Sequence, residues 1–150
     1  MNAALEKLSQ TINGTVQLDS LSKALYATDA SVYRKIPLGV AFPKDLNDLQ
    51  RIIQFCNDHS VGLIPRTAGT SLAGQCVGDG LVVDVSKHFT EIISLDLVKK
   101  QVTVQPGVIR DELNDYLAPH GLFFGPNTST ANRCMIGGMV GNNSSGTTSI

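Results

Sequence analysis

The sequence predicts an α+β fold, in which a small parallel α/β half is followed by an antiparallel half. Two observations support this prediction. A strand–helix–strand order over 38–42, 45–59 and 61–65 is typical of a parallel crossover unit. Two runs rich in β-branched residues, 91–96 and 100–105, flank a tight turn and predict an antiparallel hairpin.

The character of the sequence changes near residue 88. Before it, the apolar run 81–85 predicts another strand of the parallel sheet. We therefore expect an α/β subdomain over 1–88 and the truncated start of a second α+β subdomain over 89–150. The chain stops just after a glycine-rich loop, 141–149, so we also expect it to be a fragment of a longer protein.

Two short helices are expected before the first strand. Residues 3–12 carry apolar side chains at helical spacing. Residues 19–26 begin with Asp19, a residue type that caps helices. A loop is expected over 29–37, and Pro43 ends the strand that follows it.

The longest predicted helix, 45–59, begins with Asp45 as its N-cap. Asp48 lies in its first turn, where the helix dipole favours an acidic residue. The helix is expected to bury one stripe of side chains, made of Leu46, Leu49, Ile52, Ile53 and Cys56. The apolar run 61–64 that follows is expected to be a buried strand.

In the second half, Pro106 and Gly107 end the hairpin. An amphipathic helix is expected over 108–118, closed near His120 and Gly121. Its apolar positions are Val108, Ile109, Leu113, Tyr116 and Leu117.

We call Pro65–Gln75 the first glycine loop. It holds two glycines, two alanines and three hydroxyl residues. Because small side chains leave backbone N–H groups accessible, an anion can approach such a loop closely. Arg66 adds positive charge. The segment has the chemistry of a diphosphate site, although a plain surface loop is an equal alternative from this segment alone.

Two known phosphate-binding motifs do not fit this loop. Gly69 and Gly74 have the spacing of a Walker A loop, but Gln75 and Cys76 stand where Lys and Ser/Thr are needed. The GxGxxG motif of the Rossmann fold is absent. Nucleoside triphosphate hydrolysis and a Rossmann-type NAD site are therefore disfavoured.

We call 126–146 the second glycine segment. Within it, Gly137 and Gly138 are expected to open a short helix whose N–H groups face an anion. Two glycine segments in one small chain favour an extended ligand with two polar ends, such as a dinucleotide.

Composition excludes several other classes. The net charge is −1 and tryptophan is absent, so nucleic-acid binding has little support. The sequence has no run of 18 apolar residues and no signal peptide. Three widely separated cysteines indicate reduced thiols without a disulfide framework or zinc spacing. We expect no metal site and a cytoplasmic protein, or one peripheral to a membrane through its full-length form.

Over about 29–150 the sequence resembles the FAD-binding domain of FAD-linked oxidases of the vanillyl-alcohol oxidase / p-cresol methylhydroxylase (PCMH) type. Within that family it is most similar to D-lactate, glycolate and D-2-hydroxyglutarate dehydrogenases. The motifs that carry the resemblance are Pro65–Gly74, Pro106–Gly107, Pro126–Thr130, and Ile136–Gly138 with Asn143–Gly146.

The resemblance implies FAD as cofactor. Residues 68–74 would wrap its diphosphate, and the second glycine segment would line the adenosine-diphosphate and ribityl parts. The cofactor-binding residues that it implies are Pro65, Arg66, Thr67, Ala68, Gly69, Thr70, Ser71, Gly74, Gln75, Pro126, Ser129, Thr130, Cys134, Gly137, Gly138, Asn143, Ser145 and Gly146.

The sequence departs from the family pattern at four positions. Thr67 and Ala68 replace two glycines, Asn127 replaces an acid, and Thr128 replaces a proline. Some members link FAD covalently through a histidine at the position of Thr70. Threonine has no nucleophilic nitrogen, so the resemblance implies non-covalent FAD here.

By resemblance, the full-length protein is a flavin-dependent oxidoreductase of a small 2-hydroxy acid. The substrate and catalytic groups of the family belong to a later cap domain, so we expect no catalytic residue in this chain. Two alternatives stay open, a non-catalytic flavin-binding accessory subunit and an anion-binding domain without flavin. The fragment is also expected to self-associate through an exposed strand edge.

Overall fold

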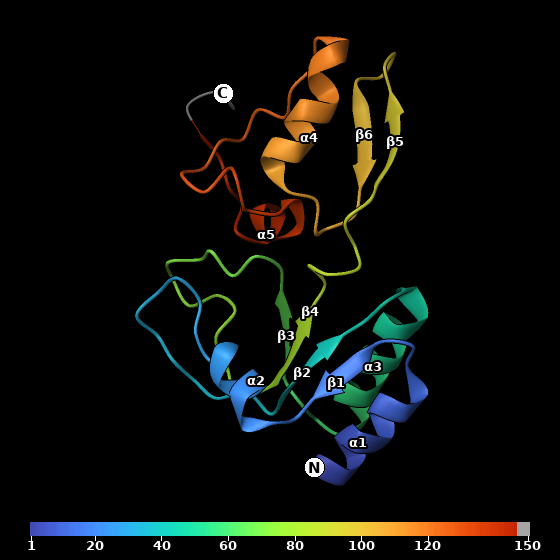
Figure 1. Cartoon of the computed structure of the whole chain (residues 1–150), viewed down its shortest axis with the longest axis vertical. Helices are drawn as coiled ribbons and strands as arrows, with labels where there is room; N and C mark the ends of the chain where they lie inside the picture. The colour runs from blue at the N-terminus through green and yellow to red at the C-terminus, as the bar shows by residue number, and fades with distance from the viewer. Residues whose placement is uncertain (147–150) are drawn as a thin grey trace.

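The computed structural model describes residues 1–146 and has two lobes, each built around its own sheet (Figure 1). The first lobe contains α1 (Asn2–Thr11), β1 (Thr15–Gln17), α2 (Ser20–Leu25), β2 (Gly39–Phe42), α3 (Leu46–Asp58), β3 (Leu63–Arg66) and β4 (Leu81–Asp84). The second contains β5 (Ile92–Asp96), β6 (Gln101–Val104), α4 (Arg110–Leu117), the 3-10 turn η1 (Ala118–His120) and α5 (Ile136–Gly141). The order confirms the predicted α+β class. The subdomain boundary at residue 88 stays a prediction, and the part of the predicted terminal loop over 147–149 lies outside the described residues.

The first sheet has the strand order β1-β2-β4-β3. β2 and β3 both run parallel to β4, and Val40 and Ile64 lie opposite Val82 from its two sides. This confirms the predicted parallel sheet. β1 pairs antiparallel with β2. The sequence does not predict β1, because three residues are too few to display a strand period.

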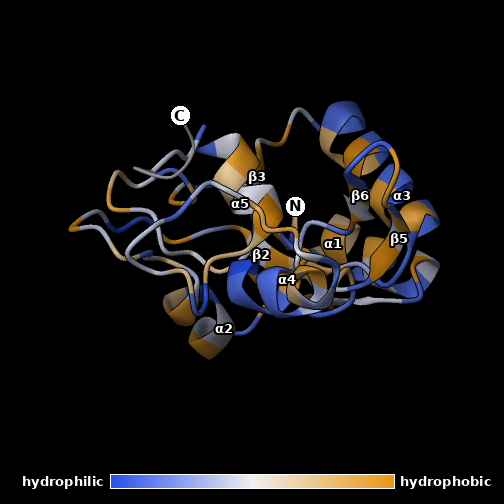
Figure 2. Cartoon of the chain, turned by 90° about the horizontal axis from the view of Figure 1, so that it is seen from above, coloured by the Kyte–Doolittle hydropathy of each residue, from blue (hydrophilic) through white to orange (hydrophobic). Residues whose placement is uncertain are grey.

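Helices α1 and α3 cover one face of this sheet. The core on that face consists of Leu5, Leu8, Ile12, Ala41, Ile52, Cys56, Leu81 and Val83. On the other face Val40, Phe42 and Val82 are buried, and Tyr26 and Ile64 pack against them. Hydrophobic and hydrophilic bands alternate around α3, as expected for a helix with one buried face (Figure 2).

The buried face of α3 differs from the predicted stripe. Ile52 and Cys56 are buried as predicted, and Leu49 packs against the same core. Leu46 and Ile53 are 70% and 55% exposed, and Asp48, which is not in the predicted stripe, is buried. Leu46 and Ile53 are seven residues apart and therefore lie on the same side of the helix, at the exposed edge of the predicted stripe. Helical periodicity identifies side chains that lie together, but it does not decide how far around the helix the contact with the sheet extends.

The prediction that the strand after α3 is buried is wrong. β3 is the edge strand of the sheet, and Leu63 is 36% exposed. β4, which has the same apolar character, lies in the interior and is buried at all four positions. The position of each strand in the sheet, rather than its composition, decides its burial.

The second lobe packs the hairpin β5–β6 against α4 and α5. Its core consists of Val108, Leu113, Leu117, Cys134, Ile136 and Met139. α4 begins at Arg110, two residues later than predicted, because Ile109 is extended and forms a bridge with Met135. Gly121 has a positive φ of 67° and ends the helical segment as predicted.

No helix within residues 1–146 is long and apolar enough to cross a membrane. Cys56, Cys76 and Cys134 are buried and unpaired, in agreement with the prediction of free thiols.

Asp45 provides a pH-dependent contribution to the stability of the first lobe. Its carboxylate accepts hydrogen bonds from the backbone N–H of Asp48 and the side-chain amide of Asn13, each at 2.9 Å. These bonds, the Asp48 N–H first, lower the pKa of Asp45. A carboxylate whose pKa is lower in the folded state stabilises the fold above the unfolded pKa, about 3.9, and this contribution is lost as the pH falls further.

We therefore expect Asp45→Asn to reduce the loss of stability below about pH 4, since asparagine also caps helices but carries no titrating charge. The measurement is the urea midpoint of wild type and variant at neutral and at acidic pH. Equal acid-induced losses in the two proteins would contradict the prediction.

Candidate functional site

The two glycine segments meet at one edge of the first sheet. β3 and β4 are parallel, so their carboxyl ends lie at the same edge, which faces α5 in Figure 1. Gly138 of α5 lies against Thr67 of the first glycine loop, because a Cβ added to Gly138 would be 2.6 Å from Thr67 Oγ1. This edge of an open parallel sheet is the usual position of a ligand site.

The first glycine loop presents a row of backbone donors. Gly69 and Gly74 have positive φ angles of 66° and 71°, which bend the chain in a way that disfavours larger residues. Ser71 Oγ accepts from the N–H groups of Ala73 and Gln75 at 3.1 and 3.4 Å. Within residues 1–146, the N–H groups of 68–72 have no acceptor. Such consecutive donors form a concave anion site.

Arg66 does not point outward as a free charge beside this row. Its Nη1 donates to the carbonyl oxygen of Thr28 at 2.7 Å, and its guanidinium lies 4.9 Å from the centre of the Tyr26 ring. Tyr26 in turn donates its hydroxyl to Asp84 at 2.5 Å. Burial, and then this hydrogen bond with Asp84, raise the pKa of Tyr26.

Sequence reasoning does not find Tyr26 or Asp84 as neighbours of the first glycine loop. The one available signal is that Asp84 is a charged residue at the end of an otherwise apolar strand, Leu81–Asp84. Tyr26 carries no signal, since it ends a helix far away in the sequence.

The second glycine segment forms turns that are tied to α4 and α5. Arg110 Nε donates to the Pro126 carbonyl at 3.2 Å. The Thr130 carbonyl accepts from the N–H groups of Arg133 and Cys134. Gly146 lies against the backbone of Asn127, because an added Cβ would be 2.5 Å from the Asn127 carbonyl oxygen. The motifs at the two ends of the segment are therefore adjacent.

The Cys134 side chain does not line the surface between the lobes. It is 4% exposed and lies in the second core, with Sγ 3.2 Å from Thr128 Oγ1 and 3.5 Å from Met139 Sδ. The resemblance implies that Cys134 lines the cofactor, but its thiol packs into the second core.

Gly137 and Gly138 begin α5 as predicted, but the first N–H groups of this helix do not face outward. Ile136 donates to the Val108 carbonyl at 2.9 Å, and Gly137 donates to the Pro106 carbonyl at 2.8 Å. The expectation of anion-facing donors is therefore wrong for these two groups. Gly137 instead allows close packing, because an added Cβ would be 2.4 Å from Pro106 Cβ.

The remaining predicted residues belong to the two glycine segments and are exposed or half-buried. Asn143 follows α5 and has a positive φ of 49°, and its N–H donates to the Val140 carbonyl at 3.0 Å. The exposed members are Pro65, Gln75, Ser129, Asn143 and Ser145, and the half-buried ones are Thr70, Pro126 and Thr130.

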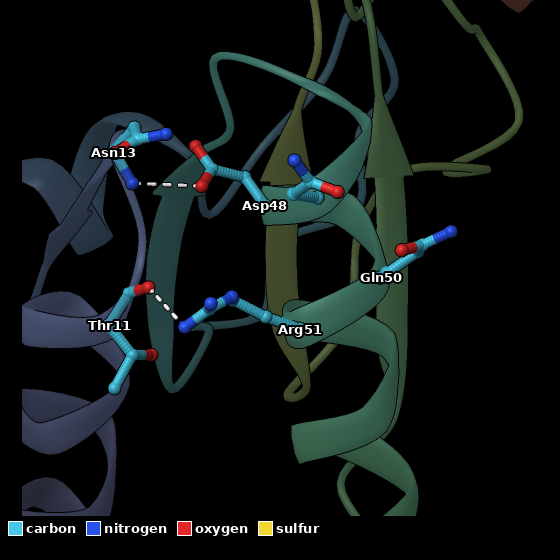
Figure 3. A pocket seen from close by; sticks show the side chains of 6 residues that line it. Thr11, Asn13, Asp48, Gln50 and Arg51 are labelled. Carbon is cyan, nitrogen blue, oxygen red and sulfur yellow. Dashed lines mark hydrogen bonds between the residues drawn. The ribbon is translucent and has the colours of Figure 1, made fainter.

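Two hollows lie in the first lobe. One, of about 360 Å³, borders the first glycine loop and is lined by Tyr33, Arg34, Lys35, Ala73, Gly74 and Val77. The other, of about 310 Å³, lies between the end of α1 and the first turns of α3 (Figure 3). Its side chains support the fold, since Asp48 accepts from Asn13 and Arg51 donates to the Thr11 carbonyl. It shares no residue with either glycine segment.

Residues 37–150 match the family described as "FAD binding domain". The chain is 39% identical over 140 residues to the D-2-hydroxyglutarate dehydrogenase of Haemophilus influenzae, covering 91% of this chain and 14% of that protein. It is 33% identical over 134 residues to the mitochondrial D-lactate dehydrogenase [cytochrome] 1 of Saccharomyces cerevisiae, covering 87% of this chain and 22% of that protein.

The fold is similar to that of p-cresol methylhydroxylase with substrate bound, with a TM-score of 0.76, 19% identity, and coverage of 95% of this chain and 28% of that one. The chain thus spans roughly a seventh to a fifth of the two curated relatives. Since the family match covers most of the chain, the chain belongs to the family of FAD-binding domains.

Proposed function

We propose that the first glycine loop holds the diphosphate of FAD and that the second glycine segment lines the rest of the cofactor. The observation that carries this proposal is the row of N–H groups over 68–72, which have no acceptor within residues 1–146 and lie at the carboxyl edge of a parallel sheet. Backbone donors of this kind suit a dianionic diphosphate, because they offer positive partial charges without a bulky side chain.

The residues present fit this group. Gly69 and Gly74 bend the loop, and Gly138 keeps the facing helix close to Thr67 without a side chain between them. We assign the cofactor-binding role to the predicted set except for Arg66, Cys134 and Gly137, whose side chains or N–H groups are engaged within the fold. Cys134 and Gly137 act by holding the second glycine segment in place, since both are engaged in packing.

We further propose that the chain is part of a longer dehydrogenase that oxidises a small 2-hydroxy acid. The names of the relatives, D-2-hydroxyglutarate dehydrogenase and D-lactate dehydrogenase [cytochrome], support this substrate class. When bound, the flavin supplies the redox chemistry, and the chain binds and orients it. We assign no catalytic residue to the chain itself, and we place the subdomain boundary near residue 88.

The FAD is proposed to be bound without a covalent link. Thr70, in the first glycine loop, has a hydroxyl where a linking histidine would need a ring nitrogen. We also propose a cytoplasmic location, and self-association of the isolated fragment through a strand edge.

The test uses the purified full-length protein. Denaturation without protease is expected to release FAD into the soluble fraction, where chromatography identifies it. Anaerobic addition of D-2-hydroxyglutarate, D-lactate or glycolate to the intact protein is then expected to bleach the flavin absorption with one of the three. Recovery of FMN alone, or of no flavin, would contradict the cofactor assignment. Bound FAD that none of the acids reduces would favour the accessory-subunit alternative.

A further inference from the structure

The side chain of Arg66 connects three parts of the first lobe beneath the first glycine loop. Its Nη1 donates to the Thr28 carbonyl at 2.7 Å, in the connection between α2 and β2. Its guanidinium lies over the Tyr26 ring, with Cζ 4.9 Å from the ring centre. A guanidinium combines hydrogen bonding and stacking in this way better than an ammonium group does.

Gly69 makes room for this arrangement. A Cβ added to Gly69 would lie 2.5 Å from Arg66 Nη2 and 2.8 Å from Cζ, so the guanidinium occupies the space that a side chain would fill. The same glycine accepts a hydrogen bond at its carbonyl from the N–H of Ala30 at 3.2 Å. The loop and the connection 28–30 are therefore joined directly by one backbone bond and indirectly through Arg66.

The positive charge of Arg66 is not cancelled by a direct ion pair. Within residues 1–146, no carboxylate lies within ion-pair distance of its guanidinium. Asp84, its cross-strand neighbour in the parallel register, accepts from the Tyr26 hydroxyl and the Ser86 N–H instead. The Arg66 guanidinium, without a direct ion-pair partner in this part of the chain, therefore lies against Gly69, within the loop whose N–H groups at 68–72 have no acceptor among residues 1–146.

We propose that Arg66 is a positioning residue for the flavin diphosphate. It holds the first glycine loop in its donor-presenting shape and supplies a positive charge from behind the loop, without contacting the cofactor. This inference rests on the proposed FAD-binding role of that loop. It accounts for the inward direction of Arg66, which the proposed function alone leaves unexplained.

The test compares FAD affinity of the full-length apoprotein at low and high salt, by flavin fluorescence titration, for wild type, Arg66→Met and Arg66→Lys. Arg66→Met removes both the hydrogen bond and the charge, so we expect affinity to fall about tenfold to a hundredfold at low salt. Arg66→Lys keeps the charge but not the planar fork, so it is expected to restore part of the affinity. Because the charge term is screened, the difference between the two variants should shrink at high salt.

Arg34→Met is the matched control. Arg34 is exposed, borders the hollow beside the same loop, and its guanidinium has no hydrogen-bond or ion-pair partner within residues 1–146. Its loss is expected to leave FAD affinity within about twofold of wild type.

Wild-type affinity in Arg66→Met would overturn the inference while leaving the proposed function intact. Equal, salt-independent losses in both Arg66 variants would reduce Arg66 to a merely structural role and would also overturn it. Failure of the proposed function is recognised separately, because the wild-type protein would then not bind FAD. If Arg66→Met does not fold, Arg66→Gln replaces it as the uncharged variant, and the same comparison with Arg66→Lys at low and high salt decides.

Discussion

Replacing Gly137 by alanine is expected to weaken FAD binding by about tenfold to a hundredfold, equivalent to roughly 1–3 kcal/mol. An added Cβ would lie 2.4 Å from Pro106 Cβ and 3.0 Å from both Pro106 Cα and its carbonyl oxygen. These atoms belong to a backbone segment and a closed ring, so they cannot rotate away. α5 must therefore move, and with it the surface that faces the first glycine loop.

Two neighbouring glycines provide graded controls on the same helix. Gly138→Ala meets Thr67 Oγ1, which can turn aside by side-chain rotation, so its effect on FAD affinity is expected to be smaller. Gly141→Ala meets no atom within 4 Å and is expected to bind FAD as wild type does. Affinity is measured by titrating the full-length apoprotein with FAD. If Gly137→Ala binds as tightly as Gly141→Ala, the packing argument for α5 is wrong.

The second large effect is expected on stability rather than on binding. Asp48→Ala should lower the free energy of unfolding of the first lobe by about 2–4 kcal/mol. Asp48 is 1% exposed, and its carboxylate accepts hydrogen bonds from three backbone N–H groups, those of Asn13 and Gly14 at 2.8 Å and that of Lys44 at 2.9 Å. Removing it leaves these partly buried donors without an acceptor. A fold with total stability of about 5–15 kcal/mol is sensitive to such a loss.

Asp58→Ala is the matched control, because Asp58 lies on the same helix and, among residues 1–146, accepts one hydrogen bond, from the exposed side chain of Gln54. It is expected to change stability by no more than about 0.5 kcal/mol. The measurements are the urea midpoint and amide hydrogen exchange of the peptides that contain Asn13, Gly14 and Lys44. Faster exchange at these amides in Asp48→Ala, but not in Asp58→Ala, is the expected result. Similar midpoints for the two variants would show that the three bonds contribute little.

Most of the local structure is predictable from the sequence because its signals act over a few residues. Asp19 and Asp45 cap α2 and α3 where their residue type and position predict it, each by accepting a bond from the N–H three residues later. The crossover order predicts the parallel sheet, and the two runs that flank a tight turn, 91–96 and 100–105, predict the hairpin. The order of the glycine motifs also identifies the family without reference to the fold.

Other features were decided by contacts between residues far apart in the sequence. Leu46 and Ile53 are exposed because the sheet covers only part of the predicted stripe of α3, and Leu63 is partly exposed because β3 is at the sheet edge. The Asp48 carboxylate accepts hydrogen bonds from the N–H groups of Asn13 and Gly14, which precede it far back in the chain.

The same holds at the candidate site. Arg66 turns inward to Thr28, and Gly137 directs its N–H to Pro106 instead of a ligand. A single sequence determines which residues form helices and strands, since those preferences are local. Only the tertiary structure decides which partner each side chain and each N–H group finds, because that choice depends on distant segments brought together by packing.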